Sequence, residues 1–188
     1  MGVGRERDVD FVPFYRLHRR TYPAYWDFFT PGEYEKRRTE LEAERTRLSA
    51  LEEATVAQLT TGEMQPERDF NQLGENTSIS RPVHGRRGRL ASANGWFSFD
   101  VPVEPGRPMA LLVTYHRDSR QPRSFEVLVD GQRIGEEKFG VSSEERFFDV
   151  TYPIPADLVQ GKEKVIVRVQ ATGGNQTATV FGIRMVRR

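Results

Sequence analysis

The chain has 188 residues, a formal net charge of +1 and no cysteine, and 37% of its residues are hydrophobic. This length and composition are typical of a globular chain of one domain with an extension, or of one and a half domains. The near-neutral charge gives no general attraction to nucleic acids or acidic membranes. The absence of cysteine excludes disulfides and thiolate chemistry, and no apolar run approaches the roughly 20 residues of a membrane span.

Residues 1–29 combine basic and aromatic side chains. The pattern predicts a short strand over Phe11–His18 and an aromatic connector over Thr21–Phe29. The apolar density predicts that this segment packs on a preceding domain, on the rest of this chain or on a second copy. The first ten residues lack the apolar stretch of a secretory signal, so localisation stays open between cytoplasm and secretion.

Residues 30–62 predict one long helix. Thr30 is the expected N-cap, Pro31 the first helical residue, and Glu33 completes a capping box. We expect the helix to run to about Leu59, where Thr60, Thr61 and Gly62 end it. Its apolar stripe fits either half of a coiled coil or a helix that lies across a sandwich or bridges two domains. That stripe contains Tyr34, Leu41, Leu48 and Leu51.

Residues 63–188 predict an antiparallel β-sandwich, because short strands alternate with turn residues at regular spacing. Asp130–Gly131 is a strong hairpin signal, since both positions favour positive φ. The expected strands are Trp96–Val103, Met109–His116, Ser124–Asp130, Gln132–Phe139, Arg146–Tyr152, Lys164–Ala171 and Ala178–Val186.

Alternation along these strands separates core from surface. The predicted core triplets are Phe97, Phe99 and Val101; Leu111, Val113 and Tyr115; Phe125, Val127 and Val129; and Val165, Val167 and Val169. The opposite faces carry Trp96, Ser98, Asp100, Thr114, His116, Glu126, Arg168 and Gln170.

Several motifs carry a resemblance to a known family. They are F-V-P-F-Y-R-L-H-R-R-T-Y-P-A-Y-W over Phe11–Trp26, T-P-G-E-Y at the helix start, N-G-W-F-S-F-D, F-E-V-L-V-D-G-Q-R-I over Phe125–Ile134, and the closing F-G-I-R-M-V-R. Together they resemble the C-terminal region of bacterial β-L-arabinofuranosidase-like glycoside hydrolases of families 127 and 146.

The resemblance implies a jelly-roll of the galactose-binding type, without the catalytic barrel. Residues 1–29 would be the remnant of a preceding β-sandwich domain, residues 30–62 the linking helix and residues 63–188 the accessory domain. Those enzymes use a cysteine nucleophile beside zinc, which this chain cannot supply. We therefore expect no catalytic residues, no metal and no cofactor in this chain.

An exposed tryptophan among polar groups is a plausible platform for a sugar ring. The predicted carbohydrate site consists of Trp96 and His116, with Arg89, Asn71 and Asp118 supplied by nearby loops. The alternative is that Trp96 packs under the long helix or the aromatic segment. The arginine-rich stretch Ser80–Asn94 could meet phosphates, uronic acids or an acidic partner, or simply be solvated.

Two functions stay open at this point. The chain is either an accessory module that binds arabinose-containing plant glycans for a glycoside hydrolase, or a structural module that supports the catalytic domain or mediates dimerisation. The expected partner in both cases is the catalytic domain of the parent hydrolase. The aromatic segment and the leucine stripe further predict a homodimer.

Overall fold

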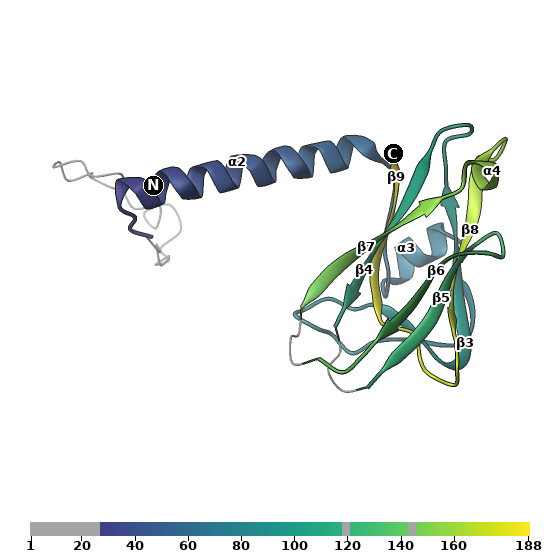
Figure 1. Cartoon of the computed structure of the whole chain (residues 1–188). Coiled ribbons are helices and arrows are strands. Elements are labelled where there is room, and N and C mark those ends of the chain that lie inside the picture. Colours follow the sequence, from purple (N-terminus) through teal and green to yellow (C-terminus); the bar gives the residue numbers. More distant parts are fainter. Residues whose placement is uncertain (1–26, 118–120, 143–145) are drawn as a thin grey trace, which may run out of the picture. The chain divides into compact units, whose positions relative to one another are not determined.

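The computed structural model describes residues 27–117, 121–142 and 146–188, and the chain divides into two compact units, residues 1–50 and 51–188 (Figure 1). The predicted strand Phe11–His18 and most of the aromatic connector lie outside the described residues.

Helix α2 spans Pro31–Ala54, and its start is the predicted capping box. The Thr30 N–H donates to Glu33 Oε2 at 2.8 Å, and the Glu33 N–H donates to Thr30 Oγ1 at 3.4 Å. These bonds satisfy N–H groups that the first turn of a helix leaves without intrahelical partners. The capping prediction is therefore confirmed.

The predicted end of this helix near Leu59 is wrong. The helix ends at Ala54, and Thr55–Thr60 form strand β1, which pairs antiparallel with β9, Val180–Arg187. Ala57 and Leu59 enter the core of the second unit. The segment Thr-Val-Ala-Gln-Leu-Thr has no strong helical or strand preference of its own, so its hydrogen bonding with β9 determines its conformation. The sandwich thus begins before residue 63.

The second unit is an antiparallel sandwich in which one layer contains β2, β3, β8, β5 and β6, and the other contains β1, β9, β4 and β7 (Figure 1). The layers join where Arg89, at the start of β3, pairs with Val180 of β9. The bounds of the remaining elements are α3 Met64–Asp69, β2 Leu73–Ile79, β3 Arg89–Pro102, β4 Met109–His116, β5 Arg123–Val129, β6 Gln132–Phe139, β7 Phe147–Ile154, α4 Ala156–Val159 and β8 Lys164–Ala171.

Three of the predicted strands, β4, β6 and β8, have the predicted ends, and β5, β7 and β9 differ by one or two residues. Strand β2, the first half of β3 and the short helices α3 and α4 are not predicted from the sequence. Strand β2 reads Leu-Gly-Glu-Asn-Thr-Ser-Ile and is largely exposed, so it lacks the alternation of a half-buried strand.

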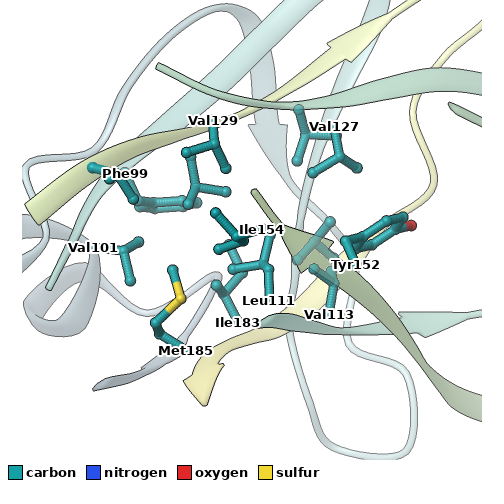
Figure 2. Close-up of a cluster of buried hydrophobic side chains, with 14 of the residues drawn as sticks. Phe99, Val101, Leu111, Val113, Val127, Val129, Tyr152, Ile154, Ile183 and Met185 are labelled. Atoms are coloured by element: carbon teal, nitrogen blue, oxygen red, sulfur yellow. The ribbon is translucent and has the colours of Figure 1, made fainter. Parts of the chain in front are cut away.

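The core lies between the two layers, and Figure 2 shows part of it. All twelve predicted core residues are buried. In Figure 2, Phe99, Val101, Val127 and Val129 from one layer face Leu111, Val113, Ile183 and Met185 from the other. Burial of each large side chain contributes about 1.5–3 kcal/mol, so this interdigitation is the main support of the sandwich.

Candidate functional site

The loop between β2 and β3 folds into a small hairpin of its own. The Val83 N–H donates to the Arg86 carbonyl at 2.8 Å, and the Arg86 N–H donates back to Val83 at 2.9 Å. Between them, His84 and Gly85 have φ angles of 47° and 77°, the signs that a type I′ turn requires. The loop therefore has a defined shape.

Close backbone approach fixes this loop on the sandwich. Gly88 is buried, and a Cβ at this position would lie 2.4 Å from the carbonyl oxygen of Val180. The Ser80 N–H donates to the Gly88 carbonyl at 2.8 Å, and the Gly88 N–H donates to Ser80 Oγ at 3.0 Å. Glycine is required at position 88 because any side chain would push the loop away from β9.

Aromatic rings at one end of the four-stranded layer support the loop. The guanidinium carbon of Arg86 lies 4.6 Å from the ring centroid of Phe147, within cation–π range. The rings of Phe147 and Phe181 meet edge to face at 4.9 Å, and His116 lies 5.0 Å from Phe147. The His84 and His116 rings lie 6.3 Å apart. The starts of β7 and β9 and the end of β4 thus form one platform under the loop.

An open pocket of about 690 Å³ lies between this loop and the neighbouring strand ends. It combines apolar surface with hydrogen-bond donors, the mixture found in small-molecule sites. None of the described lining residues is acidic. They are Ile79, Ser80, Arg81, Pro82, Val83, His84, Leu90, His116, Arg123, Thr179 and Phe181.

The two central residues of the predicted site, Trp96 and His116, lie in different layers. Trp96 is half-buried on β3, and the guanidinium carbon of Arg168 lies 4.0 Å from the centroid of its ring. The arginine occupies a ring face that a sugar would need for stacking. His116 is buried at the end of β4 and lines the pocket. Among the described residues, no ring contact or hydrogen bond joins the two.

The expected loop position of Arg89 is wrong. Arg89 begins β3, is buried, and its guanidinium contacts both carboxylate oxygens of Glu67 at 2.7 and 2.5 Å. Glu67 Oε1 also accepts the Gly62 N–H at 2.9 Å. Arg89 is therefore a structural residue that fastens helix α3 to the sandwich.

The two remaining predicted residues are Asn71 and Asp118. Asn71 is exposed and donates through Nδ2 to Asp100 Oδ2 at 3.3 Å, away from the lining residues. Asp118 lies outside the described residues. Of the four predicted residues that the structure describes, only His116 lines the pocket.

A family match covers most of the chain. The model of the family of unknown function DUF6805 matches residues 50–186, which contain the whole sandwich up to the penultimate residue of β9. The chain belongs to the DUF6805 family. This match carries no link to arabinofuranosidases of families 127 and 146. A search of curated proteins finds no match.

Solved structures similar to this DUF6805 chain include carbohydrate-binding modules. A family 35 module from an environmental isolate has a TM-score of 0.51 at 12% identity and covers 70% of this chain and 93% of its own. A family 35 module from Cellvibrio japonicus has a TM-score of 0.50 at 12% identity, with coverage of 69% and 93%. At this identity the likeness shows the fold, and it confirms the predicted jelly-roll sandwich.

One similar structure belongs to a larger enzyme. The exo-β-1,3-galactanase from Phanerochaete chrysosporium has a TM-score of 0.50 at 12% identity, and the similarity covers 69% of this chain but only 29% of the galactanase. The DUF6805 chain therefore corresponds in fold to a minor part of that enzyme.

Sequence reasoning missed most of the pocket of this DUF6805 protein. The sequence places Arg81 and His84 only in an arginine-rich stretch, and no local pattern marks Arg123 or Phe181 as pocket residues. The one local signal was His84–Gly85 between two extended runs, a pair that fits a tight hairpin turn. Arg123 and Phe181 join the pocket through strand pairing, which no local pattern reveals.

In residues 27–117, 121–142 and 146–188, no group of three or more histidine, aspartate or glutamate side chains could hold a metal ion. No helix within these ranges is both long enough and apolar enough to cross a bilayer.

Proposed function

We propose that the sandwich is a non-catalytic, carbohydrate-binding accessory module. In this proposal the sugar binds in the pocket between the β2–β3 loop and the neighbouring strand ends, called the distal pocket from here on. The observation that carries this proposal is the pocket itself, where hydrogen-bond donors and apolar groups share a space of about 690 Å³. Sugar rings require both kinds of partner, since their C–H faces pack on apolar groups while their hydroxyls need polar ones.

The fold supports this proposal because carbohydrate-binding modules of family 35 have the same architecture. The placement of the pocket also supports it. Thr179 and Phe181 lie at one end of β9, whereas Thr55, where the sandwich begins, pairs with Val186 at the other end. A catalytic body joined before Thr55 would leave the pocket at the opposite end of these strands.

The parent of this module, in our proposal, is a bacterial glycoside hydrolase of family 127 or 146, and its target is an arabinose-containing plant glycan. The proposal rests on the sequence motifs over Phe11–Trp26 and Phe125–Ile134. A catalytic region of that type encoded in the same or the adjacent reading frame is the expected finding. Its absence there would contradict the parentage without affecting the pocket.

The test is an NMR titration of the full chain with arabinan, arabinogalactan and their oligosaccharides. We expect weak binding, on the order of 0.1–1 mM, because a few hydrogen bonds leave little free energy after ordering costs. Shifts should gather at Ile79–His84, Thr179 and Phe181. Shifts centred on Trp96 and Arg168 would move the site to the five-stranded layer, and no shift with any glycan would contradict carbohydrate binding.

A structural role in assembly is the second candidate. In α2, Leu41 and Leu48 are one heptad apart and are 46% and 50% exposed, and Phe28 just before the helix is 92% exposed. Apolar side chains repeated at this spacing favour helix pairing. Light scattering of the full chain at micromolar concentration should give the mass of a dimer, and Leu41→Glu with Leu48→Glu should give a monomer. A monomeric parent chain would contradict this role.

A further inference from the structure

Phe147, at the start of β7, adjoins the distal pocket but is not among its described lining residues. Its ring meets Phe181 edge to face at 4.9 Å and lies 5.0 Å from His116, and both of these residues line the pocket. Phe181 and His116 are buried, whereas Phe147 is only half-buried. Of these three rings, Phe147 is therefore the one with surface left for a ligand.

The side chain of Arg86 covers this ring. Its guanidinium carbon lies 4.6 Å from the ring centroid of Phe147 and 5.8 Å from that of Phe181. Because Arg86 is itself exposed and Phe147 is half-buried, the guanidinium lies between the ring and solvent. The guanidinium therefore occupies the place that a sugar ring would take on Phe147.

Only the side chain of Arg86 has to move to uncover the ring. Its backbone is held in both directions, since the Arg86 N–H donates to the Val83 carbonyl at 2.9 Å and the Arg86 carbonyl accepts the Val83 N–H at 2.8 Å. The side chain beyond this backbone is long and rotatable, and an exposed cation–π contact contributes little free energy. A ligand can therefore take the ring face without reshaping the loop.

A sugar ring suits the uncovered site. Its C–H face packs on an aromatic ring, and the displaced guanidinium regains water and rotamer freedom. The adjoining pocket supplies polar groups, among them His84 and Thr179, for the hydroxyls of the same oligosaccharide. Stacking on Phe147 and hydrogen bonding in the pocket would thus serve one ligand.

We propose that the ring of Phe147 is a stacking surface of the carbohydrate site and that Arg86 is its placeholder, a side chain that a sugar ring displaces on binding. The inference rests on the proposed carbohydrate-binding function and adds a subsite to the distal pocket. It implies that Arg86 weakens binding in the parent chain, because each ligand must first break the cation–π contact. Removal of the Arg86 side chain should therefore raise the affinity.

The experiment is an NMR titration of the full chain with two neutral ligands, an arabino-oligosaccharide and a galacto-oligosaccharide. With neutral ligands, the lost positive charge of Arg86→Ala has no direct effect on affinity. Arg86→Ala should bind the tighter of the two ligands about two- to fivefold more tightly than the parent, the equivalent of an exposed cation–π contact. In the parent chain, the aromatic signals of Phe147 should shift on binding.

Phe147→Leu removes the ring but keeps an apolar side chain of similar size. It should bind the same ligand about fivefold more weakly than the parent, because the stacking contact is lost. An affinity equal to that of the parent would mean that the ring is not part of the site.

The next residue along each segment provides a matched control. Arg87 is exposed and has no ring contact among the described residues, and Phe148 packs in the core on Tyr115 at 5.9 Å and on Phe139 at 5.3 Å. Arg87→Ala and Phe148→Leu should leave the affinity unchanged. Backbone chemical shifts of β3 and β8 that match the parent chain show that each variant is folded.

The double variant Arg86→Ala with Phe147→Leu tests whether the two residues act through each other. The gain from Arg86→Ala should disappear when the ring is absent. A gain that persists would overturn the inference, because it would come from a loosened loop. A loss of affinity in Arg86→Ala alone would also overturn it, because Arg86 would then be a contact of the bound sugar.

The outcomes separate this inference from the proposed function. Binding without a shift at Phe147, or binding that neither single variant changes, would overturn the inference and leave carbohydrate binding intact. If neither oligosaccharide binds and the polysaccharides of the wider titration also fail to bind, both the inference and the carbohydrate-binding function fail.

Discussion

Arg81 and Arg89 lie eight residues apart in one arginine-rich stretch, yet the structure gives them opposite surroundings. Arg89 is buried and meets both oxygens of Glu67, while Arg81 is exposed at the rim of the pocket and has no acidic partner among the described residues. The difference comes from helix α3, whose Glu67 lies beside the start of β3 and not beside the loop. Charge that is neutralised within the chain builds the fold, and charge that is not remains available to a ligand.

The largest expected effect tests the buried member of this comparison. Arg89→Gln leaves the Glu67 carboxylate in a buried site without its cation, and Glu67 is only 4% exposed. We expect the free energy of unfolding to fall by about 3–5 kcal/mol, the range for breaking a buried ion pair. Urea denaturation measures the loss.

Arg87→Gln is the matched control for that change, because Arg87 is exposed and has no salt bridge among described residues. Its free energy of unfolding should lie within about 0.5 kcal/mol of the parent value. Equal losses in the two variants would remove the distinction between structural and available charge.

A smaller effect is expected at the edge of the buried pair. Thr77 Oγ1 accepts a long hydrogen bond from Arg89 at 3.4 Å and donates to the Leu90 carbonyl at 2.8 Å. Thr77→Val removes both contacts but keeps the shape, so we expect a loss of about 1 kcal/mol in urea denaturation. Ser78→Ala on the exposed neighbour serves as control. A loss as large as that of Arg89→Gln would mean that Thr77, and not Glu67, dominates the surroundings of Arg89.

Arg86 lies between the two extremes, because it is exposed but rests on the ring of Phe147. Arg86→Ala should lower the free energy of unfolding by about 0.5–1 kcal/mol, the range for an exposed cation–π contact. Arg81 has no such contact within the described residues, so Arg81→Ala should lower the free energy of unfolding by less. Urea denaturation measures both variants. A larger loss from Arg81→Ala would show that Arg81 serves the fold.

The smallest expected effect belongs to a surface pair far from the loop. Arg187 donates to Glu104 Oε1 at 2.9 and 2.6 Å, and this hydrogen bond lowers the pKa of Glu104. The folded state therefore gains stability above the unfolded pKa of about 4.3 and loses it as the pH falls through the folded pKa. The free energy of unfolding of Glu104→Gln should be lower than that of the parent at pH 7, and the two values should converge in acid.

The measurement for Glu104→Gln is urea denaturation across this pH range, at low and high salt. Because the pair is exposed to water, its effect should shrink in high salt and stay below that of Arg89→Gln. A difference that persists in acid would show that the substitution acts through packing and not through the carboxylate charge.

Most of the sandwich follows from local pattern. The Asp130–Gly131 hairpin is predicted because both residues tolerate positive φ, and they have φ angles of 48° and 83°. The core triplets are predicted because alternation assigns each strand a buried face. The end of α2 is not predictable in this way, since residues 55–60 become a strand only by pairing with β9, more than a hundred residues later in the chain.

The site is harder to predict than the fold. In the sequence, Trp96 shares a strand face with polar residues, as a platform for a sugar ring would. In the structure, Arg168, from a distant part of the chain, lies over its ring. Arg81 and Arg89 look alike in the sequence, and only the position of Glu67 separates their roles. The composition of Ser80–Asn94 leaves phosphates, uronic acids, an acidic partner and plain solvation open, and only the strand pairing that brings Arg123 and Phe181 beside this stretch reveals a pocket.

The pairing of the first and last strands of the sandwich has a mechanical consequence. Thr55 of β1 lies opposite Val186 of β9, so the two points are neighbours in one antiparallel ladder. Opposing forces at these two points would unzip that ladder one hydrogen bond at a time. A ligand held at the distal pocket and an anchor at Thr55 would instead load the strands along their length, so that the hydrogen bonds share the force in shear. A module attached through β1 and bound at the pocket would therefore resist a pulling force better than one whose strands are pulled apart at Thr55 and Val186.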